Sequence, residues 1–206
     1  MEKTITIDEL IVYWDSDEGK PYKKSLIDWA AYEADPQNIG CMCAQGQVLS
    51  MVGGWTPKQL KDAEQRDADN AIAKLLNIST AHAILLRLVN DKSDGAPSIV
   101  LTHPEKVLGD QAPTLLAFWR HLDRRTAEQW AAAWAAAWAA AGDAAWAAAR
   151  AAAGVAARGA AWAAAPYAGA EIQGARIMRV KGQPFTFLPV FGFAEPEAVL
   201  AAEQEA

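Results

Sequence analysis

A repeating pattern of large and small residues runs from Trp130 to Pro166. Every fourth position is marked, in the order Trp130, Trp134, Trp138, Gly142, Trp146, Arg150, Gly154, Arg158, Trp162 and Pro166, and nearly every residue between is alanine. Alanine loses no side-chain entropy in a helix and buries no polar group, so such a run is expected to be helical even without a partner. The pattern therefore predicts a long helix over this segment.

The spacing also predicts how the indole rings are arranged around that helix. Four residues turn through about 400°, so each ring lies about 40° further round than the previous one. A helix with large apolar rings on all sides must be enclosed by other helices or by a second copy of the chain. We therefore expect either a central helix in a bundle or a homo-oligomer formed through Trp130, Trp134, Trp138, Trp146 and Trp162.

The length of this helix indicates that it breaks or protrudes. Unbroken from Thr126 to Ala165, it would extend for about 60 Å at ~1.5 Å per residue, whereas a compact chain of this size has a radius of gyration of roughly 17 Å. Gly142 followed by Asp143 is the favoured break, because glycine commonly ends helices and aspartate caps them. Thr126 begins the helix, since a capping-box glutamine follows three residues later.

Shorter helices are predicted before the array. Thr56, Pro57 and Gln59 supply an N-cap, a first-turn proline and a capping-box partner for a helix that continues to Asn77. Its inward face is expected to consist of Leu60, Ala63, Ala68, Ala71, Ile72 and Leu75. Residues 80–90 are apolar nearly all round and predict a buried helix. Residues 4–13 alternate weakly and could form a short strand, although a helix could equally begin near Glu9.

The segment after Pro166 leaves two alternatives open. Residues 169–181 are expected to form a helix, because three cations then lie at its C-terminal end and Gly182 follows. The alternative is a hairpin of residues 176–180 against 185–188. Residues 185–193 are rich in phenylalanine and interrupted by prolines, so they are expected to form an extended apolar strap over the bundle.

Together these patterns predict a mostly α protein: a helical bundle around a long, broken Ala/Trp-rich helix, with an irregular Phe/Pro-rich C-terminal strap. Residues 1–125 are expected to form an N-terminal helical region. Residues 126–206 carry the array and the strap, and the two parts are expected to form one compact domain.

Composition and charge narrow the class of partner. The chain has 206 residues, a net charge of -6 and 52% hydrophobic content, which argues against a nonspecific nucleic-acid or anionic-membrane partner. The longest uncharged part of the array, Gln129 to Gly142, is shorter than the ~20 residues that span a bilayer. No apolar segment follows a basic start at residues 1–4, so a signal peptide is not expected. We expect a cytoplasmic protein, with a virion as the alternative location.

The two cysteines, Cys41 and Cys43, suggest a second class of function. They lie too close together to cross-link distant segments, so a reducing compartment is expected. A cysteine at a helix start would have a lowered pKa and could use His82 or His103 as its base, which makes a cysteine-dependent hydrolase the first alternative. Structural thiols are favoured, because free cysteine is among the most buried residue types. The histidines are not closely paired, and neither a metal site nor a cofactor is predicted.

A helix-turn-helix is the second alternative. Residues 72–79 followed by 80–87 loosely match the turn of that motif. A helix that reads DNA needs polar side chains for base edges and cations for phosphates, whereas Arg87 is the one long cation in 80–87. Two buried helices joined by a tight turn are therefore favoured over DNA binding.

One cationic cluster could contact a partner. It consists of Arg120, His121, Arg124 and Arg125. A solvated helix end that complements the helix dipole is the favoured interpretation. Contact with an anion or an acidic partner protein is the alternative.

Two resemblances concern the C-terminal part of the chain. The alanine-rich four-residue array resembles the helical repeats of a family of bacterial immunity proteins. Residues 182–193, Gly-Gln-Pro-Phe-Thr-Phe-Leu-Pro-Val-Phe-Gly-Phe, resemble segments of phage-encoded proteins. The resemblances leave residues 1–125 uncovered and imply a bacterial or phage setting and a binding role. We therefore expect a non-catalytic protein that binds or assembles with another protein, as an immunity factor, an anti-defence factor or a phage structural accessory.

Overall fold

The described part of the chain is helical. A computed structural model describes residues 4–16, 19–92, 97–140, 188–193 and 196–205. Over these residues the regular elements are helices, and the extended pairing is limited to two isolated bridges, Tyr22 with Cys43 and Ile27 with Met42. The prediction of a mostly α protein is confirmed. The chain divides into two compact units, residues 1–109 and 110–206.

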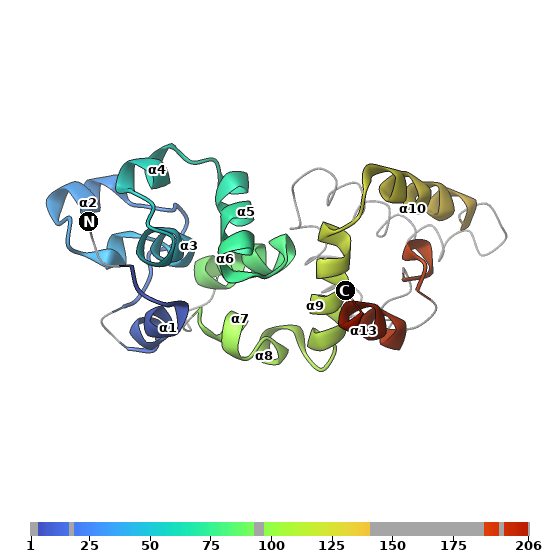
Figure 1. The fold of residues 1–206 in the computed structure, drawn as a ribbon. Coiled ribbons are helices and arrows are strands. Elements are labelled where there is room, and N and C mark those ends of the chain that lie inside the picture. Colours follow the sequence, from blue (N-terminus) through green and yellow to red (C-terminus); the bar gives the residue numbers. More distant parts are fainter. Residues whose placement is uncertain (1–3, 17–18, 93–96, 141–187, 194–195, 206) are drawn as a thin grey trace. The chain divides into compact units, whose positions relative to one another are not determined.

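Unit 1 consists of short helices joined by tight turns (Figure 1). They are α1 (Ile7–Asp15), α2 (Trp29–Ala34), α3 (Ala44–Gln47), α4 (Pro57–Asp62), α5 (Gln65–Leu76), α6 (Thr80–Lys92), α7 (Ile99–Thr102) and α8 (Glu105–Leu108), with a 3-10 turn η1 (Ile39–Cys41) and a π-helical turn η2 (Val48–Val52). Helix α6 packs against α3, α5 and α7. The turn η2 packs against α1, α3, α4 and α5, so α6 and η2 together connect the helices of the unit.

Helix α1 resolves the ambiguity at the start of the chain. The backbone N–H of Thr6 donates to the Glu9 carboxylate at 2.7 Å, and the N–H of Glu9 donates to the Thr6 hydroxyl at 3.2 Å. Leu10 and Trp14, four residues apart, are buried on the inner face. The strand considered for residues 4–13 is therefore wrong, because a capping box and helical spacing act together there.

The helix predicted from Thr56 to Asn77 is two helices. The predicted capping box between Thr56 and Gln59 is present, with Pro57 in the first turn. The chain becomes extended at Ala63 (φ -73°, ψ 137°) and restarts as α5. After the break α4 packs against η2, whereas α5 packs against η2, α3 and α6, and Leu60 of α4 is buried.

The inner face of α5 also differs from the prediction. Ala68 and Ile72 are fully buried as expected, but Leu75 is 39% exposed and Asp69 is 4% exposed. Asn77 ends α5 in the left-handed conformation with φ 51°. The chain then turns by 112° into α6. No described helix is by itself long and apolar enough to cross a membrane; α5 and α6 meet the length and composition criteria when taken as a bent pair.

Unit 2 is described over α9 (Ala112–Asp123), α10 (Ala127–Ala140), a 3-10 turn η3 (Leu188–Phe191) and α13 (Pro196–Gln204). The predicted capping box that begins the array helix is confirmed, since the Thr126 N–H donates to the Gln129 side chain at 2.8 Å and Gln129 N–H donates to the Thr126 hydroxyl at 3.2 Å. Helix α10 confirms the helical prediction up to Ala140. The break at Gly142 and the alternatives for residues 169–188 lie outside the described residues.

The described part of the predicted strap is buried as expected, but it is not extended, because residues 188–191 form the 3-10 turn η3. Phe191 is buried and meets Phe118 of α9 and Trp130 of α10 edge to face, with ring centroids 5.2 and 5.9 Å apart. Leu188 and Phe193 are also buried. Residues 188–193 thus supply part of the apolar core of unit 2. Helix α13 follows and packs along α9.

A strained residue gives a direct test of the turn before α2. Lys24 has φ 89°, and its N–H donates to Asp91 Oδ1 at 2.8 Å. A non-glycine residue in this region costs roughly 1–3 kcal/mol, and glycine avoids this cost but adds about 0.4–1 kcal/mol of chain entropy to be lost on folding. We expect Lys24→Gly to raise the free energy of unfolding by about 1 kcal/mol. Urea denaturation measures it.

The matched control is Lys23→Gly, where φ is not positive. Without strain to relieve, this variant should be less stable than the parent by up to about 1 kcal/mol. A Lys24→Gly protein that is destabilised as much as the Lys23→Gly protein would contradict the interpretation.

Candidate functional site

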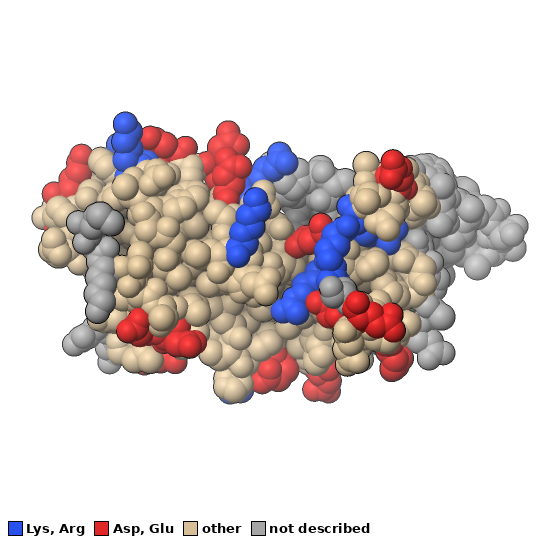
Figure 2. Space-filling model, in the orientation of Figure 1, with Lys and Arg blue, Asp and Glu red and all other residues tan. Residues whose placement is uncertain are grey.

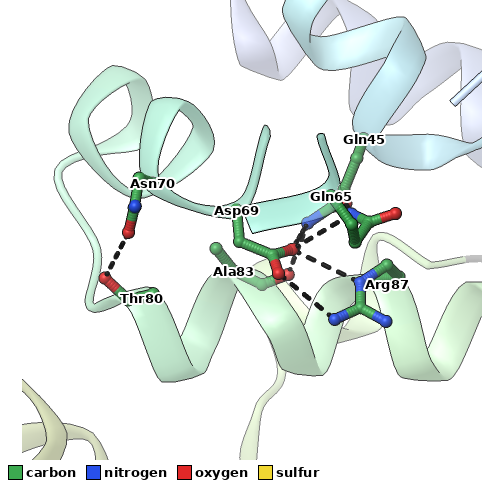
Figure 3. A network of polar contacts seen from close by, with 7 residues as sticks. All are labelled: Gln45, Gln65, Asp69, Asn70, Thr80, Ala83 and Arg87. Carbon is green, nitrogen blue, oxygen red and sulfur yellow. Dashed lines mark hydrogen bonds and ion pairs between the residues drawn. The ribbon is translucent and has the colours of Figure 1, made fainter. Parts of the chain in front are cut away.

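A buried polar network joins three helices of unit 1 (Figure 3). Its centre is the carboxylate of Asp69 on α5. Oδ1 accepts hydrogen bonds from Gln45 at 2.8 Å, from Gln65 at 3.3 Å and from the Nε of Arg87 at 3.3 Å. Oδ2 accepts from Nη2 of Arg87 at 3.2 Å. An ionised carboxylate loses its hydration when buried, and these donors replace it.

The amide of Gln45 extends the network from α3 to α6. Gln45 is fully buried, and its Nε2 donates both to Asp69 and to the carbonyl oxygen of Ala83, at 2.8 and 3.0 Å. Its Oε1 accepts from Gln65 at 2.8 Å. The polar atoms in Figure 3 point toward one another across α3, α5 and α6. The network therefore links α3, α5 and α6 in the interior of unit 1.

The sequence prediction missed the centre of this network. It noted Arg87 as the one long cation on an apolar helix, but it assigned no role to Asp69, Gln45 or Gln65. The available signal was a carboxylate inside an apolar face, since Asp69 lies between the buried Ala68 and Ile72. A buried acid and a basic residue on two apolar helices commonly pair.

Both cysteines are buried structural thiols. Cys41 lies in η1 and Cys43 is the N-cap of α3, and the two are 3% and 2% exposed. The Gly46 N–H donates to the Cys43 Sγ at 3.5 Å. Burial raises the pKa of the Cys43 thiol to about 11, and it also raises the pKa of the Cys41 thiol. The lowered pKa that a catalytic cysteine at a helix start would need is therefore absent, because desolvation outweighs the field of a four-residue helix. The burial of both thiols agrees with the favoured prediction of structural cysteines.

His82, one of the two residues considered as a base for these thiols, has a packing role. It is buried on α6, and its Nε2 lies 2.8 Å from the carbonyl oxygen of Val100 on α7. A carbonyl oxygen can accept but not donate, so Nε2 carries the proton. The ring thereby connects α6 to α7.

The α5–α6 pair has helix-turn-helix geometry without an available reading helix. The 112° bend falls within the range of roughly 90–120° seen in that motif. However, residues 81–86 of α6 are all buried, and Arg87 is bound to Asp69. A helix enclosed in this way cannot enter a DNA groove, which argues against the second alternative function.

The predicted cationic cluster lies at the end of α9 in unit 2, beside α13. Arg120 Nη1 is 3.3 Å from Glu203 Oε1, and Arg124 Nη2 contacts the other oxygen, Oε2, of the same carboxylate. Figure 2 shows Lys and Arg side chains gathered over α9 next to acidic side chains over α13. These two cations are therefore paired within the chain as well as exposed.

The other two members of the cluster are partly buried. Arg125 donates to His121 Nε2 at 3.0 Å and to the carbonyl oxygen of Gln129 at 2.7 Å, and its guanidinium lies 5.7 Å from the Trp130 ring. Burial, followed by the charges of Arg125 and Arg124, lowers the pKa of His121. A neutral His121 can accept the hydrogen bond from Arg125. The interpretation of a solvated helix end therefore holds for the exposed Arg120 and Arg124, but not for the partly buried His121 and Arg125.

Comparisons with known proteins do not place the chain in a family. Neither a protein-family model nor a curated protein nor a solved structure matches the chain. The described residues contain no group of three or more His, Cys, Asp or Glu side chains that could hold a metal ion. The surfaces that the described helices present are therefore the features from which a function can be inferred.

The thiols provide a test that separates a nucleophilic site from packing. At pH 7 we expect neither Cys41 nor Cys43 to react with a thiol–disulfide reagent in the native chain, because burial keeps both protonated and covered. In urea both should react at the rate of a model peptide. Fast stoichiometric labelling of either cysteine in the native protein would instead support the hydrolase alternative.

Proposed function

We propose that this is a non-catalytic protein that binds or assembles with another protein, in a bacterial or phage setting, as an immunity, anti-defence or phage structural accessory factor. The observation that carries the proposal is the outer face of α1. Val12 is 69% exposed and Tyr13 is 44% exposed, side by side on a helix whose other face is buried. Tyrosine and large aliphatic residues exposed together are typical of binding surfaces.

The charges around these two residues indicate what would bind there. Asp8 and Glu9 lie one turn before them and Asp15 lies just after, all exposed, and the last turn of α1 contains no basic residue. Figure 2 shows acidic side chains over α1. A partner with an apolar contact bordered by Lys or Arg would match this face in both shape and charge.

The residues that could take part in catalysis are used in packing among the described residues, which supports a binding role over a catalytic one. The cysteines are covered and protonated, His82 is bonded to a backbone oxygen, and Arg87 is bonded to a buried carboxylate. Side chains that serve the interior in this way are not free to act on a substrate. What the surface offers instead is apolar and charged contact area.

Self-association through the Ala/Trp array is part of the same proposal. Trp130, the first ring of the array, is partly exposed although it packs on Phe191 and Arg125. A second copy of the chain could cover such rings. This mode would make the protein an assembly factor rather than a binder of a different chain.

Substitution on α1 tests the proposal. The wild-type chain and a Val12→Ser, Tyr13→Ser variant are immobilised and compared for the proteins that they retain from a lysate of the bacterium that carries the gene. Removing a central tyrosine from an interface costs about 2 kcal/mol, so we expect the partner to be retained at least about tenfold less by the variant.

Leu75→Ser is the matched control, because Leu75 is a 39% exposed apolar residue on α5 rather than on α1. It should retain the partner like the wild-type chain. Equal retention by all three proteins, or no protein retained by any, would contradict binding through α1.

A further inference from the structure

The guanidinium of Arg125 joins three segments of unit 2. Arg125 follows the C-cap of α9, and its Nη1 donates to the Nε2 of His121 on α9 at 3.0 Å. It also donates to the carbonyl oxygen of Gln129 on α10 at 2.7 Å and to that of Phe191 in η3 at 3.4 Å. The same guanidinium lies 5.3 Å from the ring centroid of Phe191 and 5.7 Å from that of Trp130. One cationic side chain therefore contacts α9, α10 and η3.

The imidazole of His121 is the acceptor in this arrangement. Arginine has no acceptor atom and stays protonated, so Arg125 donates and the Nε2 of His121 carries no proton. The proton of the neutral ring therefore lies on Nδ1. The same ring meets Phe193 edge to face, with centroids 4.7 Å apart, and Phe193 is buried. The packing of residues 191–193 on the end of α9 thus includes a histidine that must be neutral.

Protonation of His121 conflicts with these contacts. The added proton occupies Nε2, which then directs an N–H at the guanidinium of Arg125 and no longer accepts from it. Two positive charges then lie at what is now a hydrogen-bond distance of 3.0 Å, in a half-buried place where water screens their repulsion less than at the surface. The charges separate only if one of the two side chains moves, and either movement removes contacts with Phe191 or Phe193.

The charged groups around His121 determine when it takes up a proton. Burial is the largest cause that lowers the pKa of its imidazole below the ordinary value of 6.5, and the cations Arg125 and Arg124 lower it further. The carboxylate of Glu203 on α13 acts in the opposite direction, but it is shared with Arg120 and Arg124. Residues 188–193 contain no titratable side chain. The other carboxylates of the end of α9, the first turn of α10 and the described part of α13 and its C-terminal flank are exposed: Asp123, Glu128, Glu197 and Glu205.

We propose that His121 and Arg125 form an acid-sensitive switch in unit 2, in which protonation of His121 separates the two side chains and releases residues 191–193 from α9 and α10. Release uncovers the parts of Phe118 and Trp130 that Phe191 now contacts, with ring centroids 5.2 and 5.9 Å away. The switch controls which apolar side chains unit 2 exposes. It therefore goes beyond the proposed binding role and does not depend on the partner of α1.

The sign of the pH dependence follows from the lowered pKa of His121. The released state takes up the proton near the ordinary pKa of 6.5, whereas the closed state takes it up only at lower pH. Above pH 6.5 the ring is neutral in both states, and the closed state keeps its full stability. As the pH falls below 6.5 the released state gains the proton first, so the closed state loses stability until the pKa of the closed state is passed.

Hydrogen exchange of residues 188–193 between about pH 7.5 and about pH 5 tests the release. The N–H of Phe193 donates to the carbonyl oxygen of Leu188 at 3.1 Å and reports on this segment. After correction for intrinsic exchange, we expect its protection in the wild-type chain to fall at least about fivefold, because the released state is favoured by its extra proton. In His121→Gln the side-chain oxygen can accept from Arg125 but takes up no proton, so protection should change by less than about twofold.

His103→Gln is the matched control, because His103 belongs to unit 1, between α7 and α8. It should lose protection at residues 188–193 as the wild-type chain does. Equal losses in the wild-type and His121→Gln chains would overturn the proposal. So would unchanged protection in the wild-type chain down to about pH 5, a result that requires no substitution.

Proton NMR of the histidine rings tests the role of Arg125 separately. Arg125→Met removes the like charge beside His121, so the imidazole should titrate at a higher pH than in the wild-type chain. Arg120→Met removes an exposed cation of α9 that is bonded to Glu203, and it should leave the titration of His121 near the wild-type pH. If His121 titrates at the same pH in the wild-type and Arg125→Met chains, Arg125 is not part of the switch and the proposal is wrong.

Discussion

The fold of unit 1 depends on one buried carboxylate. Asp69 is 4% exposed, and an ionised carboxylate in such a place costs several kcal/mol unless donors replace its water. The donors come from α3, α5 and α6, through Gln45, Gln65 and Arg87. Each of these helices must therefore be in place before the charge is satisfied.

This requirement explains why the groups with reactive potential are used in the interior. The segment that contains Gln45 also contains the two cysteines just before it, and all three side chains are buried. The helix that brings Arg87 to the network also carries His82, which reaches α7 rather than solvent. In unit 2 the situation is different, because Arg120, Arg124 and Glu203 meet at the surface.

Local features of the fold could be predicted from the sequence because their causes are local. The capping boxes of Thr56 with Gln59 and of Thr126 with Gln129 depend on residues three apart, and both are present. The buried character of residues 80–90 follows from composition. The break between α4 and α5 could not be predicted, because it accompanies the packing of the two helices against other elements of unit 1, which are distant in the sequence.

The candidate sites show the same difference between features with local causes and features that depend on residues distant in the sequence. The four cationic residues at the end of α9 were identified as a cluster, but Glu203 lies 83 residues after Arg120 in the sequence, and no local pattern indicates that pairing. The choice between a buried and a catalytic Cys43 depends on a similar distinction: its position at a helix start is visible in the sequence, whereas the depth of burial that raises its pKa is a property of the packed chain.

The most direct test of the central claim is a double-mutant cycle between Asp69→Asn and Arg87→Met, followed by urea denaturation. If the ion pair in the network holds α5 and α6 together, each single variant should lose about 2 kcal/mol, because each leaves a polar partner unpaired. The double variant should lose less than the sum of the two by at least about 1 kcal/mol. Additive losses would show that the two residues act independently, and the network would not be the interaction on which unit 1 depends.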